Sequence, residues 1–342
     1  EMCIRDSTHP DHRAMTATTS PAGAAGDALS VDLSAVIVAV TEDEPKVLAI
    51  RSDGPDALPS GRLESQHPTL GAGLRSWVER QTGLALGYLE QLYTFGDSNR
   101  VVHGSAQRVL SIGYLALVRE VRSEPTGTGG IDAVWRDWYR YFPWEDWRRG
   151  KPAIVTHMEQ QLRRWVADAS GKEERALREA RARFAFGSRD IPWSDDRVLE
   201  RYELLYEVGL VPETHRDGRR SWAPPREALA EGQTMIADHR RVLATGIARL
   251  RGKIKYRPVV FELMPPSFRF LQLQLAVEAL AGLRLHKSNF RRLVESQGLV
   301  EETGEVEAGT GGRPARLLRF RREVLLDRPA SGKRLKRQRQ NP

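Results

Sequence analysis

The sequence predicts an α+β protein of two domains, a larger strand-containing domain followed by a smaller helical domain that ends in a hairpin. A chain of 342 residues is long enough for two domains of ordinary size. Apolar runs of strand character occur before residue 120, and helical patterns dominate after residue 158. All of the net positive charge follows residue 253, which separates a near-neutral domain from a basic one.

The composition is that of a globular protein, with 40% hydrophobic and 29% charged residues. The longest apolar run, Leu33–Val40, is far shorter than the ~20 residues that span a bilayer, so we expect no membrane span. A single cysteine, Cys3, excludes a disulfide scaffold and a CxxC zinc site. We see no basic segment followed by an apolar segment, as a secretory signal would have. The lack of such a signal and the single cysteine are typical of a cytoplasmic protein.

Residues 1–30 are rich in Ala, Thr, Gly and Pro and lack periodicity, so we expect a disordered N-terminus. The first seven residues, Glu1–Ser7, resemble translated adapter sequence, which makes Met15 the expected start of the protein. The basic residues 331–342 are expected to form a tail.

Two apolar runs separated by a short polar turn predict a β-hairpin after the N-terminus. Pro59-Ser60-Gly61 is expected to be a loop, and a helix is expected from Thr69 to Gln81. Gly83 follows that helix at the position where glycine favours the left-handed conformation of a C-cap. The predicted strands are Leu33–Val40, Lys46–Arg51 and Gln107–Val118.

The middle of the chain carries an aromatic cluster and then a charged helical region. Seven aromatic residues lie between Trp135 and Trp147, and they predict a packed core more strongly than a base-stacking surface. Residues 158–225 predict charged helices, because Glu and Arg recur at i,i+4 spacing. A long helix is expected from Arg226 to about Arg251.

The C-terminal domain has the order helix, short turn, helix and hairpin, which predicts a winged helix-turn-helix. The helices are Phe270–Ala281 and Lys287–Gln297, and the second should turn Phe290, Leu293 and Val294 inward. A strand at Leu299-Val300, a polar turn at Glu301–Gly309 and a strand at Leu317–Phe320 form the predicted wing.

The charge of this domain indicates a polyanionic partner. Of the 53 Lys and Arg and the 45 Asp and Glu, 18 and 9 respectively follow residue 253. Asn and Arg side chains read base edges, and wing arginines contact phosphates or the minor groove. The alternative is a compact domain whose basic face is only solvated. The Lys333–Arg339 segment should add an attraction to the DNA phosphates that depends on salt and not on the base sequence. The candidate DNA-binding residues are Lys287, Ser288, Asn289, Arg291, Arg292, Arg313 and Arg316.

Leu58–Leu84 resembles the Nudix box, a loop–helix–loop whose glutamates hold Mg²⁺ against a diphosphate. Aligned on Gly83, the paired metal-binding glutamates correspond to Arg80 and Gln81. The Arg-Glu pair of the motif corresponds to Ser76 and Trp77. Aligned instead on Gly61, Arg75 and Glu79 match the motif, but Ser76 and Arg80 replace carboxylates. Neither alignment leaves the carboxylates that a divalent cation needs, and we expect no catalytic residues, no metal site and no required cofactor.

From about Val31 to Leu326 the chain resembles the Nudix-related transcriptional regulators of NAD metabolism, particularly their alphaproteobacterial branch. The segments that carry this resemblance are Leu92–Asp97, Arg257–Pro265, Leu285–Arg292, Gly298–Gly304 and Gly312–Phe320. The resemblance implies a Nudix-like α/β/α sandwich at 31–253, with a helical insertion at about 158–225, and a winged helix at 254–330. It further implies a homodimeric repressor of NAD biosynthesis genes that binds a double-stranded DNA operator.

The resemblance also implies an effector, which is ADP-ribose, NAD or a related nucleotide. Diphosphates need donors, and arginines can hold them without metal. The alternative for these arginines is an ordinary solvated surface. The candidate ligand-binding residues are Arg51, Arg62, Arg75, Arg80, Asp97 and Arg100.

Two other functions compete with the repressor. One is a divergent Nudix pyrophosphohydrolase that uses Glu64, Glu79 or Glu90, against which the lost carboxylate pair argues. The other is an RNA-binding Nudix protein, which a basic domain without an aromatic stacking platform does not favour.

Overall fold

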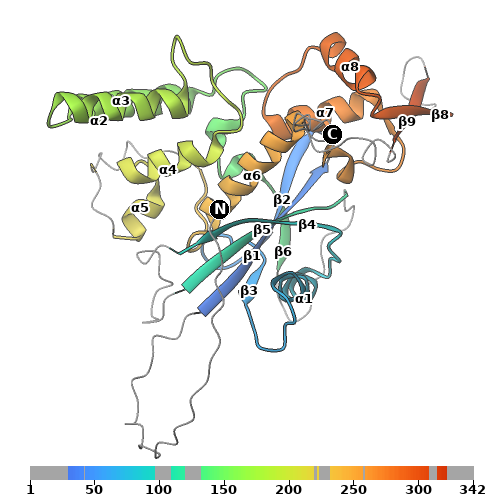
Figure 1. Cartoon of the computed structure of the whole chain (residues 1–342), viewed down its shortest axis with the longest axis horizontal. Coiled ribbons are helices and arrows are strands. Elements are labelled where there is room, and N and C mark those ends of the chain that lie inside the picture. The colour runs from blue at the N-terminus through green and yellow to red at the C-terminus, as the bar shows by residue number, and fades with distance from the viewer. Residues whose placement is uncertain are drawn as a thin grey trace, which may run out of the picture.

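A computed structural model describes residues 30–41, 43–96, 109–119, 132–218, 222, 232–256, 259–307 and 314–321. The predicted disordered terminus before residue 30 and the predicted basic tail at 331–342 lie outside this range. A mixed sheet forms the centre of the molecule, with a helical region and a smaller C-terminal domain beside it (Figure 1). Among the described residues, no helix is both long and apolar enough to cross a membrane.

The central sheet has the order β4-β5-β1-β2-β6, with the short strand β3 also paired to β1. Only the β1–β5 pair is parallel, and its register places Ala35 beside Tyr114. The predicted hairpin is confirmed as β1 and β2, and the long predicted strand is confirmed as β5. The strands are β1 (Ser30–Thr41), β2 (Glu44–Ile50), β3 (Ser60–Arg62), β4 (Tyr88–Phe95), β5 (Val109–Leu117) and β6 (Ala133–Asp137).

Both faces of β1 are buried, which is why it is apolar at every position from Ala35 to Val40. Successive side chains of a strand alternate between faces. Leu33 and Ile37 pack with the residues beneath α1 (Leu70–Thr82), whereas Val36 and Val38 belong to a separate core on the opposite face. Thr69 caps α1, and Gly83 ends it at φ 70°, as predicted.

Three sequence predictions differ from the structure in this domain. Pro59-Ser60-Gly61 was expected to be a loop, but Ser60–Arg62 pairs with β1 and forms the sheet partner of α1. The strands β4 and β6 were not predicted, because their polar or aromatic residues lack an apolar run. The long helix starts at His239 and not near Arg226, since residues 232–238 are not helical and 223–231 lie outside the described residues.

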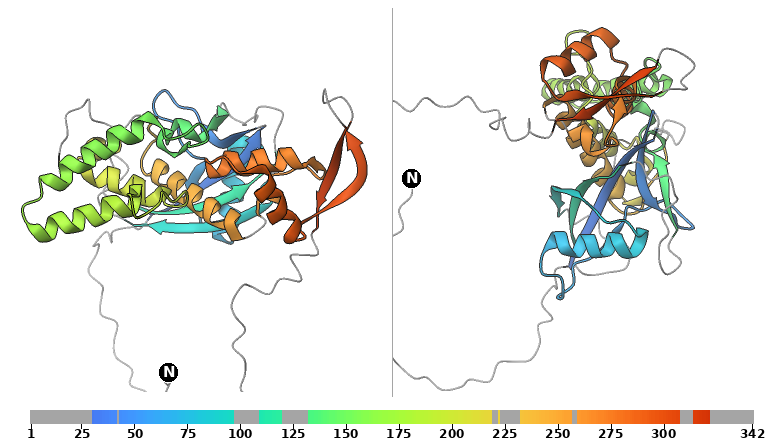
Figure 2. Two further views of the ribbon diagram at one scale, coloured as in Figure 1. Left: turned by 90° about the horizontal axis from the view of Figure 1, so that it is seen from above. Right: turned by 90° about the vertical axis from the view of Figure 1, so that its right-hand side faces the viewer.

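The predicted charged region is helical, with the elements α2 (Ala153–Ala167), α3 (Lys172–Phe186), α4 (Val198–Val208) and α5 (Pro212–Arg216). The hairpin of α2 and α3 projects from one end of the molecule (Figures 1 and 2). The aromatic cluster before it is core, as favoured, because Trp138, Tyr141, Phe142 and Trp144 have no exposed surface. Helix α6 (His239–Tyr256) packs between this region and the sheet.

The C-terminal domain consists of η4 (Val259–Glu262), α7 (Phe270–Ala281), α8 (Lys287–Ser296) and the strands β7 (Phe268–Arg269), β8 (Val300–Glu307) and β9 (Ala315–Phe320). The strands form a sheet of order β7-β9-β8, and Phe261 stacks on Phe320 with ring centroids 4.2 Å apart. Helix α7 packs against β1 and β2, so this domain shares a continuous core with the central sheet. The wing lies at the end of the molecule opposite the α2–α3 hairpin (Figure 2).

A buried network of charges joins these parts. Glu145, in η2 (Pro143–Glu145), accepts two hydrogen bonds from Arg201 of α4, at 2.6 and 2.7 Å. It also accepts one from Arg251 of α6, at 2.7 Å. Arg251 donates in turn to the Leu280 carbonyl of α7, at 2.9 Å, and all three charged side chains are at most 1% exposed. The network therefore ties the sheet domain, the helical region and the C-terminal domain to one carboxylate.

Gly282 completes this junction at the end of α7. Its φ of 70° is left-handed, and a Cβ there would lie 2.4 Å from the Glu145 carbonyl oxygen. Its own carbonyl accepts a hydrogen bond from the Trp147 backbone at 2.8 Å. Both the backbone conformation and the close approach thus require glycine.

Glu145→Gln should lower the free energy of unfolding by about 3–5 kcal/mol, because it leaves two buried guanidinium groups without a counter-charge. Urea denaturation measures this loss. The matched control is Glu207→Gln, which breaks a surface pair with Arg181 and should cost less than about 1 kcal/mol. Equal losses in the two variants would contradict the central role of the network.

His239 should make the protein less stable as the pH falls. Its Nδ1 accepts a hydrogen bond from the Leu58 backbone at 2.9 Å, and burial together with the charge of Arg216 lowers its pKa to about 4. Because the unfolded chain takes up the proton at a pH of about 6.5, stability declines from there down to the folded pKa, by up to about 3 kcal/mol. Denaturation at several pH values should show a shallower slope for His239→Gln. A slope identical to that of the parent protein would exclude this residue as the cause.

Candidate functional site

The start of α8 presents a polar and basic surface. Lys287, Ser288, Asn289, Arg291 and Arg292 are all exposed, as predicted for a recognition helix. Arg292 donates to the Asn289 side chain at 3.3 Å, so the two proposed base-reading groups lie side by side. Arg291 forms an ion pair with Glu295 of the same helix at 2.9 Å, which partly neutralises the Arg291 charge. The N-terminal end of the helix adds partial positive charge to this surface.

The buried side of α8 is narrower than predicted. Phe290 and Val294 pack inward, 9% and 5% exposed, and their i,i+4 spacing defines the packed stripe. Leu293 was expected to be buried with them but is 53% exposed, because it lies to one side of this stripe. Phe270 of α7 contacts the Phe290 ring, with centroids 5.5 Å apart.

The turn between α7 and α8 is held by a buried carboxylate. Glu278 of α7 accepts hydrogen bonds from Gln274 at 2.8 Å, from Arg284 at 2.8 Å and from the Leu285 backbone at 3.0 Å. Burial raises the pKa of Glu278, but these hydrogen bonds outweigh it and lower the pKa below its ordinary value. The charged Glu278 carboxylate therefore holds the turn that leads from α7 into α8.

The wing differs from the sequence prediction in length and in charge. Residues expected to be a polar turn, from Glu301, form most of the strand β8. Glu301 lies directly opposite Arg319 of β9, and Glu302 reaches Arg316 diagonally across the pair of strands. Arg316 pairs with Glu302 at 2.7 Å, and Arg319 pairs with Glu301 at 2.6 Å. Arg313 and the Lys333–Arg339 segment lie outside the described residues.

In the N-terminal domain, the helix that resembles the Nudix box is clamped to β3. A Cβ on Gly61 would lie 2.1 Å from the Trp77 ring, so the indole covers the strand at van der Waals distance. The Trp77 indole N–H donates to the Arg62 carbonyl at 2.8 Å. The Gln81 amide donates to the Ser60 carbonyl at 2.8 Å and accepts from the Ser60 backbone at 3.1 Å. Trp77 and Gln81 thus hold the helix on the sheet.

The arginines proposed for the ligand have different surroundings. Arg80 stacks over the Trp77 indole ring at 4.0 Å, and the Arg62 side chain lies 3.8 Å from the Asp32 carboxylate. Arg75 instead donates to the Leu86 carbonyl and, at 3.1 Å, to the Gly87 carbonyl, where it fixes the chain after α1. Arg51 pairs with Asp132 at 3.0 Å beyond the end of β2. Asp97 and Arg100 lie outside the described residues.

The three carboxylates of the hydrolase alternative also have separate surroundings. Glu90 lies on β4 and contacts α6, where it pairs with Lys253 and, at 3.3 Å, with Arg249. Burial raises the pKa of Glu90, but Lys253 and Tyr88 lower it overall. Glu79 is exposed on α1, and Glu64 faces His67 at 3.9 Å. In the described part of the chain, no three His, Cys, Asp or Glu side chains are grouped as a metal site.

Several residues that shape these surfaces were not singled out from the sequence. Glu278 had a detectable signal, since it is the one acidic residue in the apolar stretch Phe270–Ala281. Trp77 and Gln81 were noted only as replacements for catalytic residues, and nothing local to them indicated contacts with β3. Glu145 and its two arginines are far apart in the chain, so their pairing had no signal in the sequence.

Comparisons with known proteins agree with this architecture. Residues 260–320 match the family described as the NrtR DNA-binding winged helix domain. A curated protein of Acinetobacter baylyi, an ADPR responsive transcriptional repressor NtrR, is 41% identical over 99 residues. That match covers 29% of this chain, and the chain spans only 38% of the length of the relative.

Two solved structures are similar over most of the chain. A MutT/nudix family protein from Enterococcus faecalis has a TM-score of 0.50 and 14% identity, and the similarity covers 85% of this chain and 86% of that chain. An NrtR from Shewanella oneidensis, crystallised with a 27mer DNA, has a TM-score of 0.49 and 17% identity, and the similarity covers 86% of this chain and 94% of that chain. The Enterococcus structure supports the predicted Nudix-like fold. Residues 260–320 therefore match the NrtR DNA-binding winged helix domain, and in this chain they follow a domain with a Nudix-like α+β fold.

Proposed function

We propose that this protein is a transcriptional repressor that binds a DNA operator through its winged helix and responds to ADP-ribose or a related NAD-derived nucleotide. The observation that carries the proposal is the NrtR-type winged helix at 260–320, whose helix α8 starts with five exposed polar and basic residues. The Acinetobacter relative is named for both a repressor function and a response to ADPR. The resemblance of the chain to regulators of NAD metabolism makes NAD biosynthesis genes the expected targets.

In this proposal the Nudix-like domain binds its ligand and does not hydrolyse it. Arg80 and Gln81 stand where the motif has its paired metal-binding glutamates. Gln81 is hydrogen-bonded to β3, and Arg80 stacks on Trp77, so both side chains have structural contacts. Arg62 and Arg80 are then the described arginines best placed for a diphosphate, whereas Arg75 is occupied by backbone carbonyls.

The ligand would act on DNA binding by preferring one conformation of the protein. Helix α7 packs directly on β1 and β2, so a change in the Nudix-like domain reaches the winged helix through the shared core. A homodimer would place two recognition helices on successive half-sites of the operator. Effector binding would change their spacing, and with it the affinity for the operator.

The DNA contacts should divide into base-reading and phosphate-holding groups. Asn289→Ala or Arg292→Ala should each cost about 1–3 kcal/mol on the operator and leave binding to scrambled DNA nearly unchanged. Arg316→Ala, or removal of residues 331–342, should weaken binding to operator and scrambled DNA alike. The slope of the logarithm of the binding constant against the logarithm of the salt concentration should become shallower by about 0.9 per lost phosphate contact. Binding titrations at several salt concentrations, on operator and scrambled DNA, measure both effects.

Arg164→Ala, on the exposed surface of α2 far along the chain from the winged helix, is the control for these titrations and should change neither affinity. If the ratio of operator to scrambled affinity stays constant in Asn289→Ala and Arg292→Ala, α8 is not the recognition helix.

The protein should bind ADP-ribose without turning it over. With Mg²⁺ or Mn²⁺ we expect no hydrolysis at kcat values of ~1 s⁻¹ or above, because two of the metal carboxylates of the motif are replaced. Calorimetry should show ADP-ribose binding that weakens in Arg62→Ala and Arg80→Ala but not in Arg175→Ala, on the exposed surface of α3. Metal-dependent turnover that disappears in Glu79→Gln would instead support the hydrolase.

A further inference from the structure

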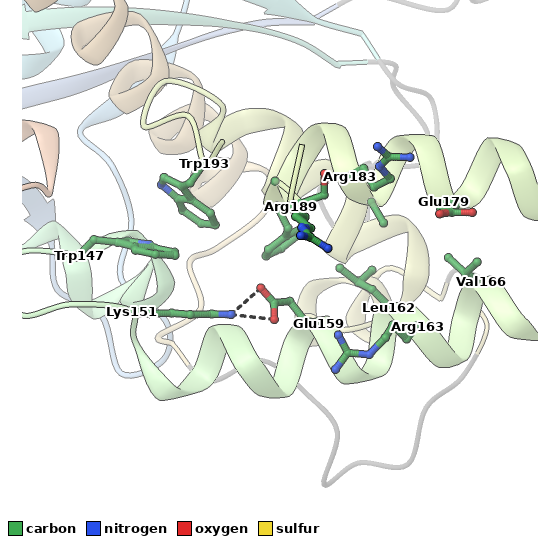
Figure 3. Close-up of a pocket in the computed structure, with 14 residues that line it drawn as sticks. Trp147, Lys151, Glu159, Leu162, Arg163, Val166, Glu179, Arg183, Arg189 and Trp193 are labelled. Atoms are coloured by element: carbon green, nitrogen blue, oxygen red, sulfur yellow. Dashed lines mark hydrogen bonds and ion pairs between the residues drawn. The ribbon is translucent and has the colours of Figure 1, made fainter. Parts of the chain in front are cut away.

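A cavity lies within the helical region, away from the helix that resembles the Nudix box. It has a volume of about 670 Å³, is open to solvent, and is lined by α2, α3, the segment before α2 and the segment that leads from α3 to α4. In Figure 3 the Trp147 and Trp193 side chains lie at one end, and Val166 and Glu179 lie at the other. Cavities of about 300–1,000 Å³ are of the size that holds small ligands.

The charged groups around this cavity favour an anion. Four basic side chains line it, against two acidic ones. Lys151 is neutralised by Glu159, since its Nζ lies 2.7 Å from both carboxylate oxygens. The cationic residues that remain are Arg163 of α2, Arg183 of α3 and Arg189 after α3.

Two of these arginines have no acidic partner. Arg183 lies 3.4 Å from the Asp190 carboxylate, which is 77% exposed. Neither Arg163 nor Arg189 forms an ion pair or a side-chain hydrogen bond with another described residue. They come from different segments, α2 and the segment after α3, yet line the same cavity. Paired guanidinium groups in this arrangement suit a carboxylate or a phosphate.

The remaining wall is aromatic and aliphatic. The rings of Trp147 and Trp193 pack together with centroids 4.4 Å apart, and Phe186 contacts Trp193 edge-on at 6.1 Å. Leu162 and Val166 of α2 continue this apolar wall. A hydrated inorganic anion would leave these surfaces in contact with water, whereas a ligand with a ring would cover them.

We propose that this cavity is a second ligand site, which takes a small anion with an attached aromatic ring. The carboxylate or phosphate lies between Arg163 and Arg189, and the ring lies against the apolar wall. The site adjoins the buried charge network, because Trp193 covers the guanidinium of Arg201 at 3.8 Å. It is separate from the residues proposed above for ADP-ribose and for DNA.

Calorimetric titration of the full chain with phenyl phosphate, benzoate and inorganic phosphate tests this site without DNA or ADP-ribose. At least one of the two ring-containing probes should bind saturably, and at least tenfold more tightly than inorganic phosphate. The stronger of the two identifies the anionic group that the arginines prefer.

Arg163→Glu and Arg189→Glu should each weaken this binding at least tenfold. Arg164→Glu is the matched control, because it makes the same charge change at the next residue of α2, which does not line the cavity, and should alter binding less than about twofold. Equal thermal unfolding of the three variants shows that their fold is intact.

Three results would overturn the proposal: no saturable binding of either ring-containing probe, equally tight binding of inorganic phosphate, or the same loss in Arg163→Glu and Arg164→Glu. None of them bears on the repressor function, which is measured with DNA and ADP-ribose.

Discussion

The architecture depends on one buried carboxylate. Glu145 lies between the guanidinium groups of Arg201 and Arg251, and these three side chains come from a short helix after the sheet, from α4 and from α6. Burying a charge costs free energy unless an opposite charge lies beside it, so the carboxylate and the two guanidinium groups must all be held in place together. Arg251 extends the network to the Leu280 carbonyl at the end of α7, and Gly282 allows the backbones to approach. The helical region, the sheet domain and the winged helix therefore have a fixed junction.

In the Nudix-like domain, the helix that resembles the Nudix box has structural contacts with the sheet. In the motif, one face of this helix carries carboxylates that hold a cation. In this chain, Trp77 and Gln81 fasten α1 to β3 through the Arg62 carbonyl and the Ser60 backbone. Gly61 makes this possible, because any larger residue would collide with the indole.

The winged helix combines a rigid base with an exposed reading surface. Glu278 fixes the turn, and the Phe290–Val294 stripe anchors α8, so the polar start of the helix projects outward. The glutamates of β8 neutralise part of the wing charge, which leaves α8 as the more basic of the two surfaces among the described residues. The same core continues beneath α7 to the central sheet, so the winged helix and the sheet domain are packed together.

The sequence by itself determined the elements whose patterns are local: the hairpin of β1 and β2, the capped helix α1, and the two helices of the winged domain. It also located the exposed start of α8, because helical spacing separates the polar side chains from Phe290 and Val294. The strands β3 and β4 and the length of β8 were decided by pairing with distant segments, for which their own residues give no periodic signal. The roles of Glu145 and of Arg75 were likewise set by tertiary contacts. From the sequence alone a charged side chain is expected on the surface, and only the fold determines that Glu145 meets buried arginines and that Arg75 meets backbone carbonyls after α1.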